Sequence, residues 1–178
     1  THPLSGAAPV AGKGRSLFPW TLFKSALSSH HALAQTVETR RKSLARDADP
    51  VVGMNPAQQT EDEALAKLSD LCAVIDDDSS SKLQTLIEQL KEIGVSKNKS
   101  SKRVVIFSER IATLDWLART LPDALGLDRL KHIRELHGGV ADVKQMEIIE
   151  EFGLGDSKVK LLLTGDMASE GVNLHRQC

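Results

Sequence analysis

Apolar residues recur along the chain in two periods, and the change between them falls near the middle. Before Gly94 the spacing is three to four residues, so residues 18–44 predict two helices broken at 28–31, and residues 65–75 predict a third. The run 83–93 repeats its apolar residues at helical intervals, and Gly94 is a typical helix stop. The first half of the chain is therefore expected to be helical.

After Gly94, short β-branched runs alternate with helical stripes. Strands are predicted at about residues 103–108, 131–136 and 159–163, with a helix in each interval. The second of these helices has an apolar stripe that we expect to be core, namely Val140, Val143, Met146, Ile149 and Phe152. This alternation favours an α/β fold in which crossover helices connect the strands of a parallel sheet.

Three parts are expected. Residues 1–16 are rich in Gly, Ala and Pro without periodicity, which predicts a disordered leader. Residues 17–78 form a helical connector, and residues 79–178 form the α/β lobe. The first residue is Thr rather than Met, so the chain is expected to be a fragment of a longer protein.

Composition narrows the class of protein. The chain is 40% hydrophobic and 26% charged, as is ordinary for a soluble domain, and no apolar run approaches the roughly 20 residues that span a membrane. The two cysteines lack zinc-ligand spacing, which indicates neither a metal site nor a disulfide and fits a cytoplasmic location. A net charge of −1 and 3% aromatic residues predict that any nucleic-acid contact is local and follows the backbone.

Two short segments resemble parts of an ATP-binding site, but neither matches the required motif. Gly12-Lys13-Gly14 does not complete a phosphate loop, and without a preceding strand or a third glycine it does not indicate a dinucleotide enzyme. Glu61-Asp62-Glu63 lacks a preceding apolar strand and is interpreted as charge at a helix start. The chain therefore lacks both parts that hold ATP and magnesium.

Four segments, taken in order, carry a family resemblance. They read S-K-L-Q-T-L at 81–86, V-V-I-F-S-E-R at 104–110, L-H-G-G at 136–139 and L-L-L-T-G-D-M-A-S-E-G-V-N-L at 161–174. The second resembles motif IV and the last resembles motif V of superfamily two helicases. From residue 81 onward the chain thus resembles the second RecA-like lobe of Swi/Snf-type or bacterial RNA-polymerase-recycling ATPases, and the preceding helices resemble the segment that joins the two lobes.

The resemblance implies an ATP-dependent helicase or translocase as the parent protein. ATP and magnesium would be bound mainly by the first RecA-like lobe, which this chain does not contain. The expected partners are that lobe and the backbone of DNA or RNA. Because the sequence stops before the arginines of motif VI, we expect no catalytic residue here and an inactive isolated fragment.

Loops that follow parallel strands meet at one edge of a sheet, so the site residues are sought there. Small hydroxyls, basic groups and exposed backbone suit phosphate contacts, which predicts a nucleic-acid-binding set of Ser108, Arg110, His137, Gly138, Thr164 and Ser169. Glycine permits close approach and asparagine offers both a donor and an acceptor, so the resemblance implies a cofactor-binding set of Glu170, Gly171 and Asn173.

Two departures from the family pattern leave an alternative open. Gly165 stands where relatives commonly have Ser or Thr, and Gln145 stands where they commonly have a basic residue. If these mark lost contacts, the chain is a non-catalytic α/β interaction or scaffold module, a degenerate helicase lobe. Arg103, in a basic run before the first strand, is either a solvated side chain or a phosphate contact.

Overall fold

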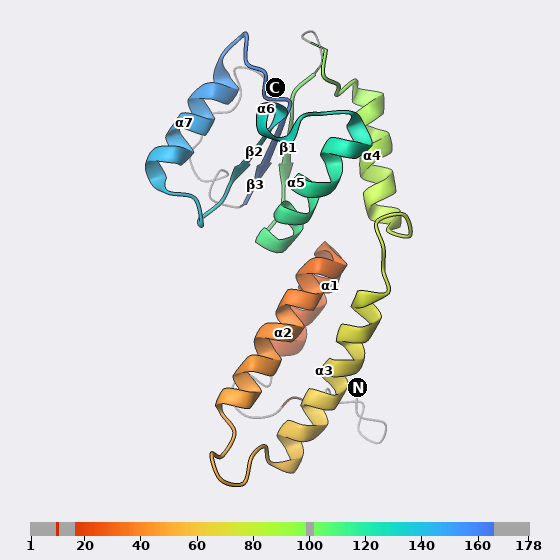
Figure 1. The fold of residues 1–178 in the computed structure, drawn as a ribbon, viewed down its shortest axis with the longest axis vertical. Helices are drawn as coiled ribbons and strands as arrows, with labels where there is room; N and C mark the ends of the chain where they lie inside the picture. Colours follow the sequence, from red (N-terminus) through yellow and green to blue (C-terminus); the bar gives the residue numbers. More distant parts are fainter. Residues whose placement is uncertain (1–9, 11–16, 99–101, 166–178) are drawn as a thin grey trace. The chain divides into compact units, whose positions relative to one another are not determined.

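The computed structural model describes residue 10 and residues 17–98 and 102–165 (Figure 1). The chain divides into two compact units, Thr1–Asp76 and Asp77–Cys178, and each is considered by itself. Within the described ranges, no helix is both long and apolar enough to cross a membrane.

The first unit contains three described helices, α1 (Phe18–Ser28), α2 (His30–Arg46) and α3 (Pro56–Ala73). The predicted break is confirmed at Ser29, whose backbone is extended and whose hydroxyl accepts a hydrogen bond from Ala32 N at 3.0 Å. This hydroxyl satisfies one of the free N–H groups at the start of α2, so the chain can turn and begin a new helix.

The third helix begins earlier, and buries less, than the apolar pattern indicates. Asn55 and Gln58 form a reciprocal capping box that starts α3 at Pro56. Leu65 and Cys72 are buried, whereas Leu71 is 62% exposed and Ile75 is 40% exposed. The predicted stripe over 65–75 is therefore wrong at its end, because the buried face passes through Cys72 and the helix stops before Ile75.

Two ion pairs join α2 to α3. The Arg40 guanidinium donates to both Glu61 carboxylate oxygens at 2.7 and 3.0 Å, and Arg41 donates to Asp62 at 2.7 and 3.1 Å. The Arg40 Cζ also lies 5.1 Å from the centroid of the Phe18 ring of α1. Interpreting these acids as helix-start charge was wrong, since they lie past the first turn of α3 and pair with arginines of the neighbouring helix.

The second unit holds a three-stranded sheet in the described part of the chain. Strands β1 (Val104–Phe107), β2 (Ile133–Leu136) and β3 (Leu161–Thr164) run parallel in the order β1-β3-β2, as predicted for an α/β fold with crossovers. The middle strand, β3, is buried at all four positions. A strand paired on both sides and covered on both faces must be apolar throughout, and this is the Leu-Leu-Leu run of the sequence.

Two strand starts differ from the expected ones. Residues 129–132 form a short helix, α6 (Arg129–His132), because Asp128 accepts a hydrogen bond from Lys131 N at its start. The second strand therefore begins at Ile133 rather than Lys131. The third begins at Leu161 rather than Val159, since residue-to-residue pairing with β1 starts there.

Helices cover both faces of the sheet (Figure 1). Alternate residues Ile133, Leu161 and Leu163 pack with α4 (Ser81–Ile93) and α5 (Ile111–Leu125) in one apolar cluster. Leu136 and Leu162 pack with α7 (Asp142–Gly153) in another. The result is a sandwich of helix, sheet and helix around two cores.

The buried stripe of α7 differs from the predicted one. Ile148 and Phe152 are buried, but Val143 is 72% and Met146 is 64% exposed, so assigning the last two to the core was wrong. The residues that face the sheet follow the helical repeat backward from Phe152 through Ile149 and Ile148. Val143 and Met146 lie outside the face of α7 that packs on the sheet.

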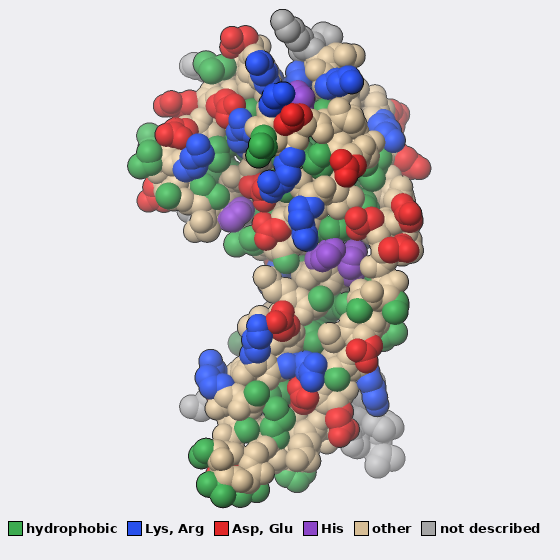
Figure 2. Space-filling model, in the orientation of Figure 1, with side chains coloured by type: hydrophobic (Ala, Val, Ile, Leu, Met, Phe, Trp, Pro, Cys, Tyr) green, Lys and Arg blue, Asp and Glu red, His purple; other side chains and the backbone are tan. Residues whose placement is uncertain are grey.

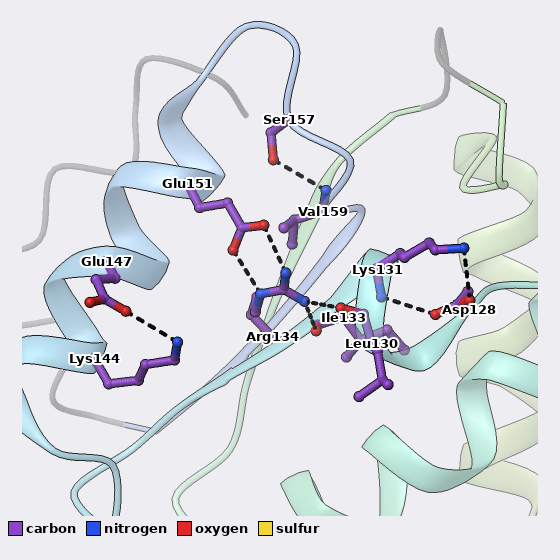
Figure 3. A network of polar contacts seen from close by, with 10 residues as sticks. All are labelled: Asp128, Leu130, Lys131, Ile133, Arg134, Lys144, Glu147, Glu151, Ser157 and Val159. Carbon is purple, nitrogen blue, oxygen red and sulfur yellow. Dashed lines mark hydrogen bonds and ion pairs between the residues drawn. The ribbon is translucent and has the colours of Figure 1, made fainter.

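Two arginines fasten α7 to the sheet. Arg134 of β2 forms a two-bond ion pair with Glu151 of α7, both bonds at 2.7 Å (Figure 3). Arg103 donates to the carbonyls of Phe152, Leu154 and Gly155 at 2.7–2.9 Å. The guanidinium thus satisfies the free carbonyls at the helix end, and Arg103 is a structural residue rather than a phosphate contact.

Asp77 anchors the beginning of the second unit. Its carboxylate accepts from Trp116 Nε1 at 2.7 Å and from Thr120 Oγ1 at 3.1 Å, both on α5. Its backbone carbonyl accepts from Gln84 Nε2 of α4 at 3.0 Å. Asp77 therefore links the start of the second unit to both α4 and α5.

The paired arginines of the first unit allow a matched test of burial. Glu61 is 2% exposed beside Arg40 at 14%, whereas Asp62 is 24% exposed beside Arg41 at 40%. Glu61→Gln should lower the free energy of unfolding by about 3 kcal/mol, because it leaves a largely buried guanidinium without its carboxylate. Asp62→Asn should cost less than about 1 kcal/mol, because water screens that pair.

The measurement is urea unfolding followed by Trp20 fluorescence in a Trp116→Phe background, so that the signal reports the first unit. Arg41 lowers the pKa of Asp62 through its hydrogen bond. The Asp62 contribution is therefore present above the unfolded pKa and lost as pH falls through the folded one, so the Asp62→Asn deficit should vanish in acid. Equal costs for the two variants at neutral pH would contradict the burial argument.

Candidate nucleic-acid interface

The carboxyl ends of the three strands stop at one level. Phe107 and Leu136 both pair with Thr164, so the next residues, Ser108, His137 and Gly165, emerge side by side. Ser108 N donates to Thr164 O at 3.0 Å, and Gly165 N donates to Leu136 O at 3.0 Å. These bonds extend the ladder by one residue and fix the spacing of the three loops. We call the ends of the strands and the residues that follow them the carboxyl edge.

Ser108 and Arg110 shape the turn from β1 into α5. The Ser108 hydroxyl accepts from Arg110 N at 3.2 Å, which holds the residue before the helix in an extended conformation. Arg110 is half-buried, and its Nε is buried without a hydrogen-bond partner among the described residues. A buried N–H without a partner is costly, so a hydrogen bond from outside the described residues would stabilise this side chain.

His137 is half-buried and held by its own loop. Its Nδ1 accepts from Gly139 N at 3.2 Å, and its carbonyl accepts from Val140 N at 2.9 Å. In the neutral ring an accepting Nδ1 places the proton on Nε2. Gly138 is exposed beside it, so its backbone is open to a ligand.

The His137 ring limits the space for a side chain at position 139. A Cβ at this position would lie 3.1 Å from both Nδ1 and Cε1 of His137. At Gly165 a Cβ would meet the His137 Cβ at 3.7 Å and Ser108 O at 3.9 Å, which is ordinary contact. A side chain at the second glycine of the L-H-G-G segment would therefore require the imidazole to shift, whereas space alone does not require Gly165.

Two acidic residues that the sequence analysis did not identify lie beside His137. Asp115 of α5, Glu135 of β2 and His137 each place one potential ligand atom within 4.8 Å of the others. Burial raises the pKa of Glu135, and Asp115 adds to the rise while Arg129 opposes it. The signal in the sequence was the alternation of Glu135 and His137, which puts both on one face of β2.

Thr164 does not present its hydroxyl to the carboxyl edge. The side chain is fully buried, and Oγ1 donates to Gly165 O at 3.2 Å. Alternation along β3 directs Thr164 to the face that α7 covers, as for Leu162. This position argues against the predicted nucleic-acid contact through the Thr164 side chain. The Thr164 carbonyl still helps to position the carboxyl edge, because it accepts the hydrogen bond from Ser108 N.

The remaining predicted residues lie outside the described ranges. They are Ser169 of the nucleic-acid set, and Glu170, Gly171 and Asn173 of the cofactor set. Among the described members, Ser108, Arg110, His137 and Gly138 all lie in the two loops that follow β1 and β2.

Gln145 has a structural role of its own. Its Nε2 donates to Val140 O at 2.6 Å, bridging α7 to the loop that follows His137. A side chain used in this way is not available to a phosphate. The departure at this position therefore has a local explanation, which is support of the L-H-G-G loop.

Comparison with protein families matches residues 81–177, more than half of the chain, to the helicase conserved C-terminal domain. The chain belongs to this family. Its second unit is a RecA-like helicase C-terminal lobe, a kind of domain that generally associates with nucleic acid and with an N-terminal lobe. Neither the curated proteins nor the solved structures gave a match.

Gly139→Ala tests the support of His137 in this helicase lobe. The new methyl group would lie too close to the ring, so the imidazole should turn away and its bond from Gly139 N should be lost. We expect a changed Nδ1 chemical shift in the nitrogen NMR spectrum of the histidine ring. Gly165→Ala is the matched control and should leave that shift near its original value. An unchanged Nδ1 shift in Gly139→Ala would contradict the packing argument.

Proposed function

We propose that this helicase C-terminal lobe grips the sugar-phosphate backbone of DNA or RNA at the carboxyl edge. The contacts would come from Ser108, Arg110, His137 and Gly138, joined by residues of the segment after Gly165. The parent protein would be a cytoplasmic ATP-dependent helicase or translocase. The observation that supports the proposal most is the common level of the three strand ends within the region that matches the family.

The charge distribution supports local contacts rather than a broad electrostatic surface. Basic and acidic side chains are interspersed over the face in view (Figure 2), and the net charge is −1. Binding would then depend on a few placed donors and on backbone N–H groups, which follow phosphates without reading bases. Affinity for isolated nucleic acid should be low and should fall with salt.

For the same lobe we propose a share of the ATP cleft. Glu170, Gly171 and Asn173 would face nucleotide and magnesium held mainly by the first RecA-like lobe. Closure of that lobe on ATP would change the grip of the carboxyl edge, which couples hydrolysis to movement. By itself the chain lacks the phosphate loop and acid box, so the isolated fragment would be inactive.

A second candidate is a scaffold module, a helicase lobe that has lost its nucleic-acid contacts. The observations that favour it are the side chains of Gln145 and Thr164, which both hydrogen-bond within the domain. The position of the half-buried Arg110 directly after β1, with a buried Nε that has no partner among the described residues, favours the gripping function instead. Nucleic-acid binding separates the two.

Arg110→Ala tests the grip. Fluorescence anisotropy with labelled single-stranded DNA and RNA should show weaker binding, with the slope of log affinity against log salt reduced by about 1 because one phosphate contact is lost. Arg119→Ala, which removes an exposed arginine from the same helix, is the matched control and should preserve the slope. Identical slopes for wild type and both variants would favour the scaffold module.

ATP hydrolysis by the isolated chain is a separate test. Phosphate release from ATP and magnesium should stay at background, with or without nucleic acid, because this chain carries no complete phosphate loop. Adding the parent's first lobe as a separate chain is the second arm. It should raise ATP affinity if the cleft is shared, but not hydrolysis, because the motif VI arginines are still missing. Nucleic-acid-stimulated hydrolysis by the isolated chain would refute the expected inactivity.

A further inference from the structure

We propose that Asp115, Glu135 and His137 form a binding site for one divalent metal ion of the Mn²⁺ class. Their potential ligand atoms, two carboxylate oxygens and one ring nitrogen, lie within 4.8 Å of one another. Asp115 lies on α5, far along the sequence from Glu135 and His137, which lie together at the end of β2. The fold, not a local loop, therefore brings them together.

The sheet geometry fixes two of the three ligands. Glu135 and His137 are two residues apart along one strand direction, so both lie on the face of β2 that α5 covers. Ile133 on the same face packs in the α4–α5 core, which confirms the direction. Asp115 comes from the second turn of α5, at the end of the helix nearest the carboxyl edge.

The cluster has more negative charge than its neighbours neutralise. Arg129 Nη2 pairs with Glu135 Oε1 at 2.6 Å, so one cation faces the two carboxylates of the cluster. Asp115 forms no ion pair within the described part of the chain. One oxygen of each carboxylate lies within 4.8 Å of the other, so their negative charges repel each other. A cation between them would remove that repulsion.

The donor set indicates the kind of ion. Carboxylate oxygens suit Mn²⁺ and Mg²⁺, and imidazole adds a preference for a transition metal, so the mixed set favours Mn²⁺ over Mg²⁺. Three protein ligands leave coordination positions for water or a phosphate oxygen. Coordination through Nε2 requires the ring proton to move to Nδ1, and the contact from Gly139 N is then lost.

This site does not depend on the proposed nucleic-acid grip. The ligands would hold Mn²⁺ in the protein alone, and the metal titration contains no nucleic acid. Saturable metal binding with no change in DNA or RNA affinity would support the metal site and show that it acts separately from the nucleic-acid contacts. Metal-dependent binding of DNA or RNA at the carboxyl edge would connect the two.

The experiment titrates MnCl₂ into the full chain by isothermal calorimetry, and records amide NMR spectra of the same protein. We expect one saturable site, and paramagnetic broadening centred on Glu135 and His137. Asp115→Asn should weaken binding about tenfold or more, since it removes one anionic ligand with little change in shape. Asp123→Asn, an exposed acid two turns along α5, should bind like wild type.

A further control removes two adjacent imidazoles of the first unit. The double variant His30→Gln/His31→Gln changes two rings of α2 that lie 4.3 Å apart, and it should retain the site. The proposal is overturned by the absence of saturable binding, by equal affinity in the Asp115 and Asp123 variants, or by broadening centred elsewhere. The broadening in wild-type protein decides the location even if a variant fails to fold.

Discussion

The organisation of the second unit depends on one strand that is hydrogen-bonded on both sides. Leu161–Thr164 pairs with β1 and β2 at every residue and is buried throughout, so a shift of register would expose leucines and misalign both neighbours. The alignment also places Ser108, His137 and Gly165 at one level. Stability and site geometry therefore have the same origin, and residues that form the core also position the candidate interface.

The features that depend on hydrophobic periodicity and composition could be predicted from the sequence. The helical first half, the parallel strands and the loops at Ser108 and His137 all followed from the apolar pattern and the family resemblance. Prediction from the sequence failed where a contact between distant residues decides which side chains are buried or paired. Met146 is exposed because the buried face of α7 is selected by the sheet, and Glu61 pairs with Arg40 because α2 and α3 pack side by side. No local pattern encodes either fact.

Polar side chains that cap and bridge elements form a second class that the sequence concealed. Arg103 binds three carbonyls at the end of α7, and Gln145 supports the loop after His137. The sequence left Arg103 open as a solvated side chain or a phosphate contact, and it marked Gln145 as a departure from a basic residue of the family pattern. The tertiary structure shows which donors are already engaged. Among the residues that it describes, the half-buried Arg110 has a buried Nε–H without a hydrogen-bond partner.

The attachment of Asp77 has a mechanical consequence. The preceding residue, Asp76, is the last of the first unit, and Asp77 is bonded to Trp116 and Thr120 in the middle of α5. A displacement of Asp77 would strain its bonds to α5 and to Gln84 of α4. Because α5 also carries Asp115 and starts beside Arg110, that strain would fall on the helix that holds residues next to the strand ends.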